Sequence, residues 1–145
     1  NGPLGFLEIL YTPSAIILAQ AVIATPIVTG ITLAAIQHLP ANLRLQILAL
    51  GATRVQMVWI LVKEARLPLL AAVMAGFGGV ISEVGASIMV GGNIKGYSRV
   101  LTTATVMETG RGNFEVAIAL SIILLLLSFL INAILTQIQQ RERPR

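Results

Sequence analysis

The sequence predicts an all-α, polytopic membrane protein with about three helical spans. Composition is the first reason, because 56% of the 145 residues are hydrophobic and only 11% are charged, whereas soluble domains carry roughly 25% charged residues. The placement of the charges is the second reason. No Asp, Glu, Lys or Arg occurs in residues 9–43, 67–82 or 116–140, and the first and third of these gaps exceed the roughly 20 residues that cross a bilayer as a helix.

The three spans are predicted over residues 13–39, 67–90 and 114–138. In the first span, Gln20 is the one strongly polar side chain before Gln37, and we expect it to face protein rather than lipid. Small residues recur four positions apart in the second span, a spacing that lets helix backbones approach closely. They are Ala71, Ala75 and Gly79 on one line, and Ala72 and Gly76 on another.

The polar connection over residues 40–68 is predicted to be structured. A short helix is expected over residues 42–51, with Asn42 as its N-cap and Gly51 ending it. An amphipathic helix follows, for which Thr53 is a possible cap. Three apolar residues are expected to share one face of the short helix: Leu43, Ile47 and Leu50.

Basic residues near the span ends predict the orientation, because they are enriched in cytoplasmic loops. One set lies in the connection and the C-terminal tail: Arg44, Arg54, Lys63, Arg66, Arg141, Arg143 and Arg145. The smaller set lies between the last two spans: Lys95, Arg99 and Arg111. The larger set places the connection and the C-terminus in the cytoplasm, with Asn1 and Glu8 outside. Trp59 then suits the headgroup level.

The sequence lacks the residues for several kinds of chemistry. There is no cysteine and one histidine, His38, and the absence of Asp excludes Ser-His-Asp catalysis and a metal cluster. The glycine-rich run at residues 91–96 does not have the spacing of a nucleotide-binding P-loop. We therefore expect a protein that is not an enzyme, has no ATPase site and binds no metal or nucleic acid.

Glu83 is the charged residue inside a predicted span. An ionisable group at that depth costs about 2.5 kcal/mol or more unless it is paired or faces water. One interpretation makes it a pathway or gate residue, together with Ser82, Gly85 and Asn93. The other makes it a structural acid, satisfied by backbone N–H groups of the turn at Gly85 or by Asn93.

Two stretches resemble known transport proteins. The run Leu45-Gln46-Ile47-Leu48-Ala49-Leu50-Gly51-Ala52-Thr53-Arg54 resembles the cytoplasmic E-A-A-x-x-x-G signature of permease subunits of binding-protein-dependent ABC importers. It matches over Leu50-Gly51-Ala52-Thr53 and departs over residues 45–47 and at the usual Leu-Pro positions, where Lys63 and Glu64 stand. The second stretch comprises Ser82-Glu83-Val84-Gly85-Ala86 and Gly91-Gly92-Asn93-Ile94-Lys95-Gly96. It resembles permeases for tetrahedral oxyanions and, with residues 99–104, looks most like the tungstate-type permease.

The resemblance implies that residues 1–145 are the C-terminal portion of an ABC importer type I-like transmembrane domain, in the plasma membrane of a bacterium or archaeon. It implies a homodimer that forms a path for tungstate and works with a cytoplasmic ABC ATPase and an extracytoplasmic oxyanion-binding protein. ATP and Mg would bind to the ATPase, and no cofactor to this chain. The residues implied in ATPase coupling are Leu43, Arg44, Ile47, Leu50, Gly51, Ala52 and Arg54.

Two alternatives stay open at this stage. A molybdate or sulfate permease would keep the class and change the substrate. A non-transporting membrane anchor would recruit a cytoplasmic partner through residues 40–68.

Overall fold

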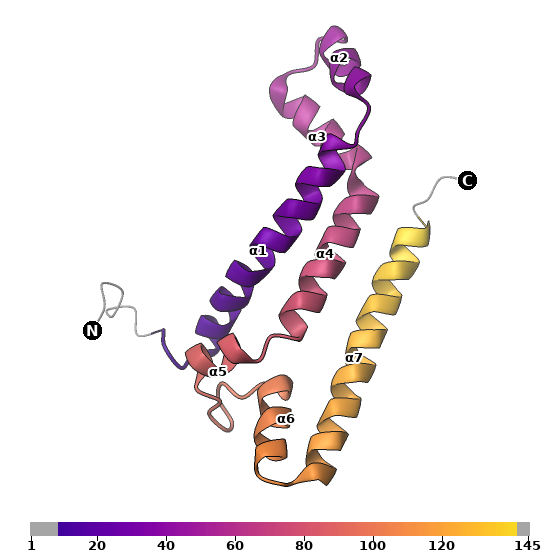
Figure 1. The fold of residues 1–145 in the computed structure, drawn as a ribbon. Coiled ribbons are helices and arrows are strands. Elements are labelled where there is room, and N and C mark those ends of the chain that lie inside the picture. Colours follow the sequence, from indigo (N-terminus) through magenta and orange to yellow (C-terminus); the bar gives the residue numbers. More distant parts are fainter. Residues whose placement is uncertain (1–8, 142–145) are drawn as a thin grey trace.

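The computed structural model describes residues 9–141, so Asn1, Glu8, Arg143 and Arg145, which entered the orientation argument, lie outside the described residues. Within this range the chain forms helices and no strand (Figure 1), which confirms the all-α prediction. The helices are α1 (Pro13–Gln37), α2 (Ala41–Ala49), α3 (Arg54–Glu64), α4 (Arg66–Ile81), α5 (Gly85–Gly91), α6 (Leu101–Gly110) and α7 (Phe114–Arg141).

Helices α1 and α7 are each long and apolar enough to cross a membrane. Helix α1 begins where Thr12 accepts a hydrogen bond from the Ala15 N–H and Pro13 supplies a preset φ. It continues through Pro26 for 25 residues, about 37 Å at 1.5 Å per residue. The predicted first and third spans are confirmed.

The predicted second span, over residues 67–90, is not one continuous helix. Helices α4 and α5 meet at a bend of 65° across residues 82–84, and they form either a broken span or a re-entrant element. Local hydrogen bonds explain the break. The Ser82 hydroxyl donates to the Gly79 carbonyl at 2.9 Å, and the Glu83 carboxylate accepts the Ala86 N–H at 2.9 Å. Side chains thus replace continuous helical bonding at this point.

The small residues of α4 allow close helix packing, as predicted, and the structure shows that the partner is α1. A Cβ built on Gly76 would lie 2.6 Å from Val28 Cγ2, and one on Gly79 would lie 2.9 Å from Ile27 Cδ1. Ala72 is fully buried, whereas Ala75 is exposed. The close contact therefore runs along Ala72, Gly76 and Gly79 rather than along both predicted lines.

The connection over residues 40–68 is structured, but its first cap differs from the prediction. Helix α2 begins after Pro40 with no side-chain cap, so the prediction of Asn42 as N-cap is wrong, because the fixed φ of Pro40 already turns the chain into the helix. Gly51 follows α2 with a φ of +78°, as a helix-ending glycine should. Thr53 forms a capping box with Gln56 at the start of α3, which confirms that cap.

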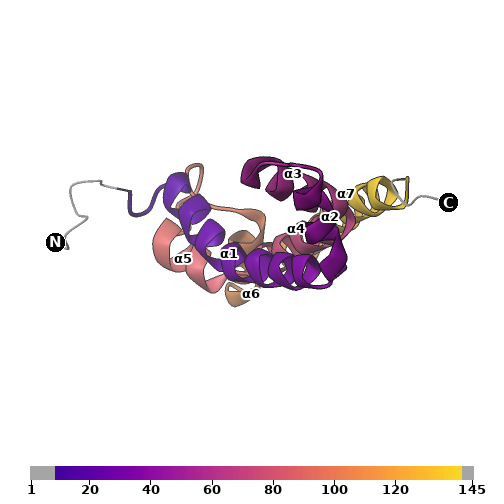
Figure 2. The same ribbon diagram turned by 90° about the horizontal axis from the view of Figure 1, so that it is seen from above.

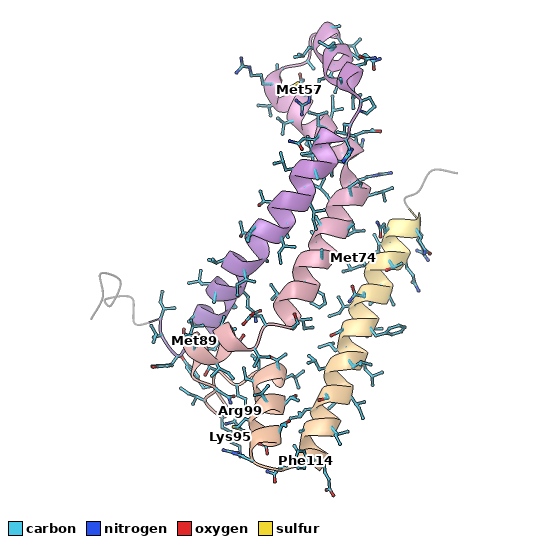
Figure 3. All side chains as sticks on the ribbon, viewed as in Figure 1. Met57, Met74, Met89, Lys95, Arg99 and Phe114 are labelled. Atoms are coloured by element: carbon cyan, nitrogen blue, oxygen red, sulfur yellow. The ribbon has the colours of Figure 1, made fainter. Side chains whose placement is uncertain are left out.

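The helices lie in an open row rather than around a closed core. Helix α4 packs against both α1 and α7, and Figure 2 shows the same flattened arrangement from above. Helices α2 and α3 lie beyond one end of the row, and α5 and α6 lie at the other (Figure 1). The described end of α7, at Arg141, lies toward the α2–α3 end, while Lys95 and Arg99 lie at the opposite end (Figure 3).

Candidate functional site

The break between α4 and α5 carries a chain of polar contacts that reaches α1. Gln20 Nε2 donates to Ser87 Oγ at 3.1 Å, and Ser87 Oγ donates to the Glu83 carbonyl at 3.2 Å. Ser87 is 1% exposed. Gln20 therefore faces protein, as predicted, and the turn that carries Glu83 is tied to α1.

Glu83 itself is half-buried and satisfied locally. Its Oε1 accepts the Ala86 N–H, and the same oxygen lies 3.2 Å from the position of a Cβ built on Gly85. The hydrogen bond from the Ala86 N–H agrees with the interpretation of Glu83 as a structural acid that accepts backbone N–H groups of the turn at Gly85. The structure places Ser82, Glu83 and Gly85 together at the break.

Asn93 belongs to a different group of contacts, which fixes the loop between α5 and α6. Its backbone has a φ of +50°. Its Oδ1 accepts from Arg99 Nε at 3.1 Å and from the Thr103 hydroxyl at 3.0 Å, and its carbonyl accepts from Arg99 Nη2 at 3.2 Å. The four predicted pathway residues thus divide into the break and this loop.

Sequence reasoning missed the buried hydroxyl groups of this end. Thr103 is fully buried and Ser98 nearly so. Ser98 donates to the Gly91 carbonyl and accepts the Ile94 N–H at 3.1 Å. The signal was the cluster of Ser and Thr directly after a glycine-rich run, since such side chains satisfy the backbone of tight turns.

Close backbone packing holds the start of α1 against the end of α5. The Tyr11 N–H donates to the Val90 carbonyl at 2.7 Å. A Cβ on Gly91 would lie 2.6 Å from Ile16 Cδ1, and one on Gly92 would lie 2.6 Å from Tyr11 Cδ1. Helix α1 therefore supports both halves of the broken helix, α4 along its length and α5 at its beginning.

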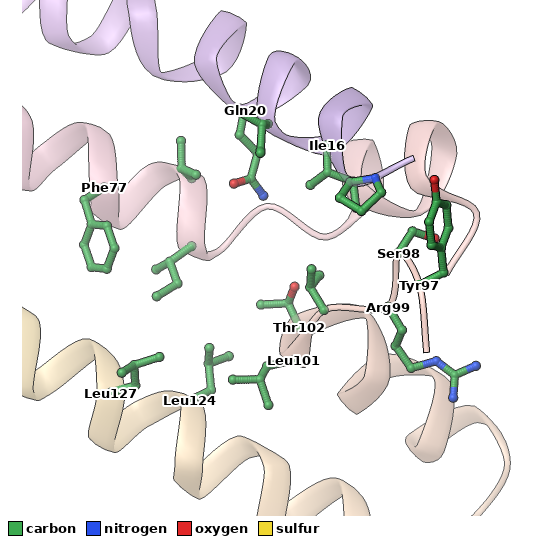
Figure 4. A pocket seen from close by; sticks show the side chains of 15 residues that line it. Ile16, Gln20, Phe77, Tyr97, Ser98, Arg99, Leu101, Thr102, Leu124 and Leu127 are labelled. Carbon is green, nitrogen blue, oxygen red and sulfur yellow. The ribbon is translucent and has the colours of Figure 1, made fainter. Parts of the chain in front are cut away.

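A cavity of about 390 Å³ lies among α1, α4, the loop before α6, α6 itself and α7 (Figure 4). Apolar side chains such as Phe77, Leu124 and Leu127 form most of its wall, and Gln20 and Thr102 supply polar groups. The Arg99 guanidinium points away from the centre of the cavity in Figure 4, consistent with its bonds to Asn93. The cavity interior therefore offers an apolar surface with few hydrogen-bonding groups.

The predicted coupling residues lie at the other end of the molecule, on α2 and the turn after it. The predicted apolar face is divided, because Ile47 is 5% exposed, Leu50 is 88% exposed and Leu43 is half-buried. Ile47 turns inward as α2 packs back on α3, and Leu50 lies past the last helical residue. Arg44, Gly51 and Arg54 are exposed and Ala52 is half-buried.

The exposed large apolar side chains of α2 and the residue after it are Leu45, Leu48 and Leu50. They, rather than Ile47, form the outward surface of α2. The role of the predicted residues in coupling stays a prediction.

Comparison with known proteins shows the family. Residues 4–144 match the model of the binding-protein-dependent transport system inner membrane component. The chain belongs to this family. The resemblance drawn from Gly51 and from the glycine-rich run after Glu83 is thereby confirmed at the level of the family.

Three curated relatives of this inner membrane component are similar over nearly the whole chain. The tungstate uptake system permease protein TupB of Peptoclostridium acidaminophilum is 40% identical over 97% of this chain and 61% of its own length. A probable anion ABC transporter permease protein of Haloferax volcanii is 40% identical over 100% of this chain and 65% of its own length. The TupB protein of Campylobacter jejuni is 36% identical over 92% of this chain and 56% of its own length.

This inner membrane component thus spans 56% to 65% of the length of those relatives. No solved structure matches the chain. Family membership and the long apolar helices α1 and α7 together identify a multi-pass membrane protein.

Proposed function

We propose that the chain is part of the transmembrane permease subunit of an ABC importer for tungstate, which forms the translocation path and couples it to a partner ATPase. The observation that carries the substrate is the 40% identity, over 97% of this chain, to a protein named as a tungstate uptake system permease. A second protein of that name, from another organism, is 36% identical. The relative from Haloferax volcanii is named only for an anion, which agrees with the class.

In this proposal the α2–α3 end faces the cytoplasm and meets the ATPase. Helix α2 projects beyond the row of long helices (Figure 1) and exposes Leu45, Leu48 and Leu50, which suit a groove on a partner, because helices dock through apolar positions on one side. The turn at Gly51 fixes the angle between α2 and α3. Movement of the ATPase would thus be passed to α4 through α3.

At the other end, the break that carries Ser82, Glu83 and Gly85 is proposed as the gate of the path. A carboxylate repels an oxyanion, so Glu83 is not suited to bind the substrate. Its carboxylate instead caps the start of α5 and so sets the shape of the break. Asn93 holds the neighbouring loop.

The proposed assembly contains two copies of the permease, the cytoplasmic ABC ATPase and an extracytoplasmic oxyanion-binding protein. ATP and Mg bind to the ATPase in this scheme, and this chain binds no cofactor and performs no catalysis. The C-terminus is cytoplasmic, in the plasma membrane of a bacterium or archaeon. Arg141 at the α2–α3 end supports this orientation, because it joins the basic residues of the connection on one side of the row.

The test is reconstitution of the complete transporter in vesicles with its ATPase and binding protein. Tungstate is expected to stimulate ATP hydrolysis and uptake more than molybdate or sulfate. Equal responses to the three anions would remove the tungstate assignment and keep the importer. No response to any of them, with the complex assembled, would favour the membrane anchor.

Coupling is tested separately with Gly51→Pro. Proline fixes φ near −65°, whereas Gly51 has a φ of +78°, so the angle between α2 and α3 must change. We expect assembly of the complex to persist and transport-linked ATP hydrolysis to be lost. Unchanged hydrolysis would refute the role of this turn in coupling.

A further inference from the structure

Helix α3 presents an apolar stripe that no described part of the chain covers. Val55 is 80% exposed and Trp59 63% exposed, and Val58 and Val62 are exposed as well. Leu61 is 6% exposed, and Met57 and Ile60, on the side away from the stripe, are half-buried. One face of α3 therefore packs on the protein, and the opposite face leaves four large apolar side chains outside.

Cations lie along both edges of this stripe. At about 100° per residue in a helix, Arg54 lies on one side of the valines and Lys63 on the other, beyond Trp59. The Lys63 ammonium lies 5.2 Å from the centroid of the Trp59 ring, and Arg54, Val55, Val58, Trp59 and Val62 together line a shallow hollow. Both cations are exposed.

The position of α3 along the chain places the stripe at the membrane surface. Helix α3 ends at Glu64, and α4, which with α5 forms the apolar broken helix, begins at Arg66. Lys63 is thus within one turn of the start of a membrane segment. A lysine and a tryptophan at such a point favour the headgroup region, where the ring is amphipathic and the ammonium meets phosphate.

We infer that α3 is an interfacial helix, with the Val55, Val58, Trp59 and Val62 stripe lying in the headgroup region and Arg54 and Lys63 holding anionic phospholipid headgroups. An apolar stripe with basic edges is the pattern of helices that lie in the interface. The centre of a protein contact is instead depleted in lysine. The inference concerns the contact of α3 with lipid and does not depend on the transported anion.

The chain contains a single tryptophan, which allows a direct test in the assembled transporter. The fluorescence difference between the parent and the Trp59→Phe transporter isolates the signal of Trp59. Vesicles containing phosphatidylcholine or phosphatidylglycerol brominated near the headgroup end of the acyl chains are then compared with unbrominated ones. Loss of most of the Trp59 signal in the brominated vesicles is expected, and an unchanged signal would overturn the inference.

The same measurement with and without the ATPase identifies a competing occupant. Quenching that persists with the ATPase bound supports contact with lipid. Quenching that disappears when the ATPase binds would overturn the inference and assign the stripe to the ATPase.

The preference for anionic lipid is tested by charge. At an equal share of the bilayer, brominated phosphatidylglycerol should quench Trp59 more than brominated phosphatidylcholine. Lys63→Gln should weaken this preference by about fivefold, as expected for one cation at an anionic surface, while Lys95→Gln, at the far end of the molecule, should leave it unchanged. Equal quenching by the two lipids in the parent, or equal effects of the two variants, would overturn the role of Lys63.

Discussion

Replacing Gly76 by alanine should separate α1 from α4, and the structure gives the size of the effect. The added Cβ would lie 2.6 Å from Val28 Cγ2, whereas carbon atoms in favourable contact lie roughly 3.5–4.0 Å apart. Val28 is β-branched and lies within α1, so its χ1 angle has one strongly preferred value and cannot easily move away. Relief of the overlap therefore requires a shift of the helices.

Overpacking of this kind costs about 1–3 kcal/mol. Alanine also has a higher helix propensity than glycine by about 1 kcal/mol, which offsets part of that cost. Gly78→Ala is the matched control, because Gly78 is on the same helix and a Cβ there would meet nothing within 4 Å. The propensity gain is common to both variants, so Gly76→Ala should be less stable than Gly78→Ala by about 1–3 kcal/mol.

The free energy of unfolding is measured in detergent micelles by titration with SDS and followed by circular dichroism. Gly79→Ala should lie between the two variants, because its Cβ would meet the movable end of Ile27 at 2.9 Å. Val28→Ala in the Gly76→Ala background should recover part of the loss. Equal stability of the Gly76 and Gly78 alanine variants, or no coupling between positions 28 and 76, would refute the reasoning.

Three further predictions concern the polar contacts of the α5 end. A double-mutant cycle of Gln20→Leu and Ser87→Ala should give a coupling of about 0.6 kcal/mol in the free energy of unfolding, and additive effects would contradict the hydrogen bond between them. Asn93→Gly keeps a left-handed backbone and loses the side-chain bonds to Arg99 and Thr103. Asn93→Ala loses the same bonds and adds about 1–2 kcal/mol of backbone cost, so a Tm of the alanine variant at or above that of the glycine variant would contradict this. Glu83→Gln should keep the hydrogen bond at the start of α5 and normal uptake in vesicles, whereas Glu83→Leu should lose both. Loss of transport in the Gln variant would show that transport requires the charge of Glu83 rather than the shape of the break.

Local patterns in the sequence predicted much of the fold. The long runs without charged residues predicted the two long helices, because an apolar run of that length matches the thickness of a bilayer when it is helical. The capping box at Thr53 and the helix-ending Gly51 depend on residues that are close in sequence, so they were also predictable. The small residues of α4 indicated close helix packing but did not identify the partner helix, which the structure shows to be α1.

The sequence indicated which residues belong to the candidate sites, but it did not indicate which of those residues contact one another. The run after Ser82 indicated the family, yet the bend of 65° between α4 and α5 did not follow from hydropathy, which is the same for a straight and for a broken helix. Ile47 was predicted among the residues that couple to the ATPase. Helical periodicity shows which residues share a face, but it does not show whether that face points outward or toward the protein. The burial of Ile47 depends on how α2 folds back on α3.

The sequence by itself predicted a helical membrane protein and indicated the family of binding-protein-dependent transport components, because length, apolarity and short motifs are properties of consecutive residues. Only the tertiary structure decided that α1 supports both halves of the broken helix, that Gln20 reaches Ser87, and that Asn93 holds Arg99 rather than Glu83. The physical reason is that these contacts join residues whose distance in space depends on helix packing and on the bend at the break.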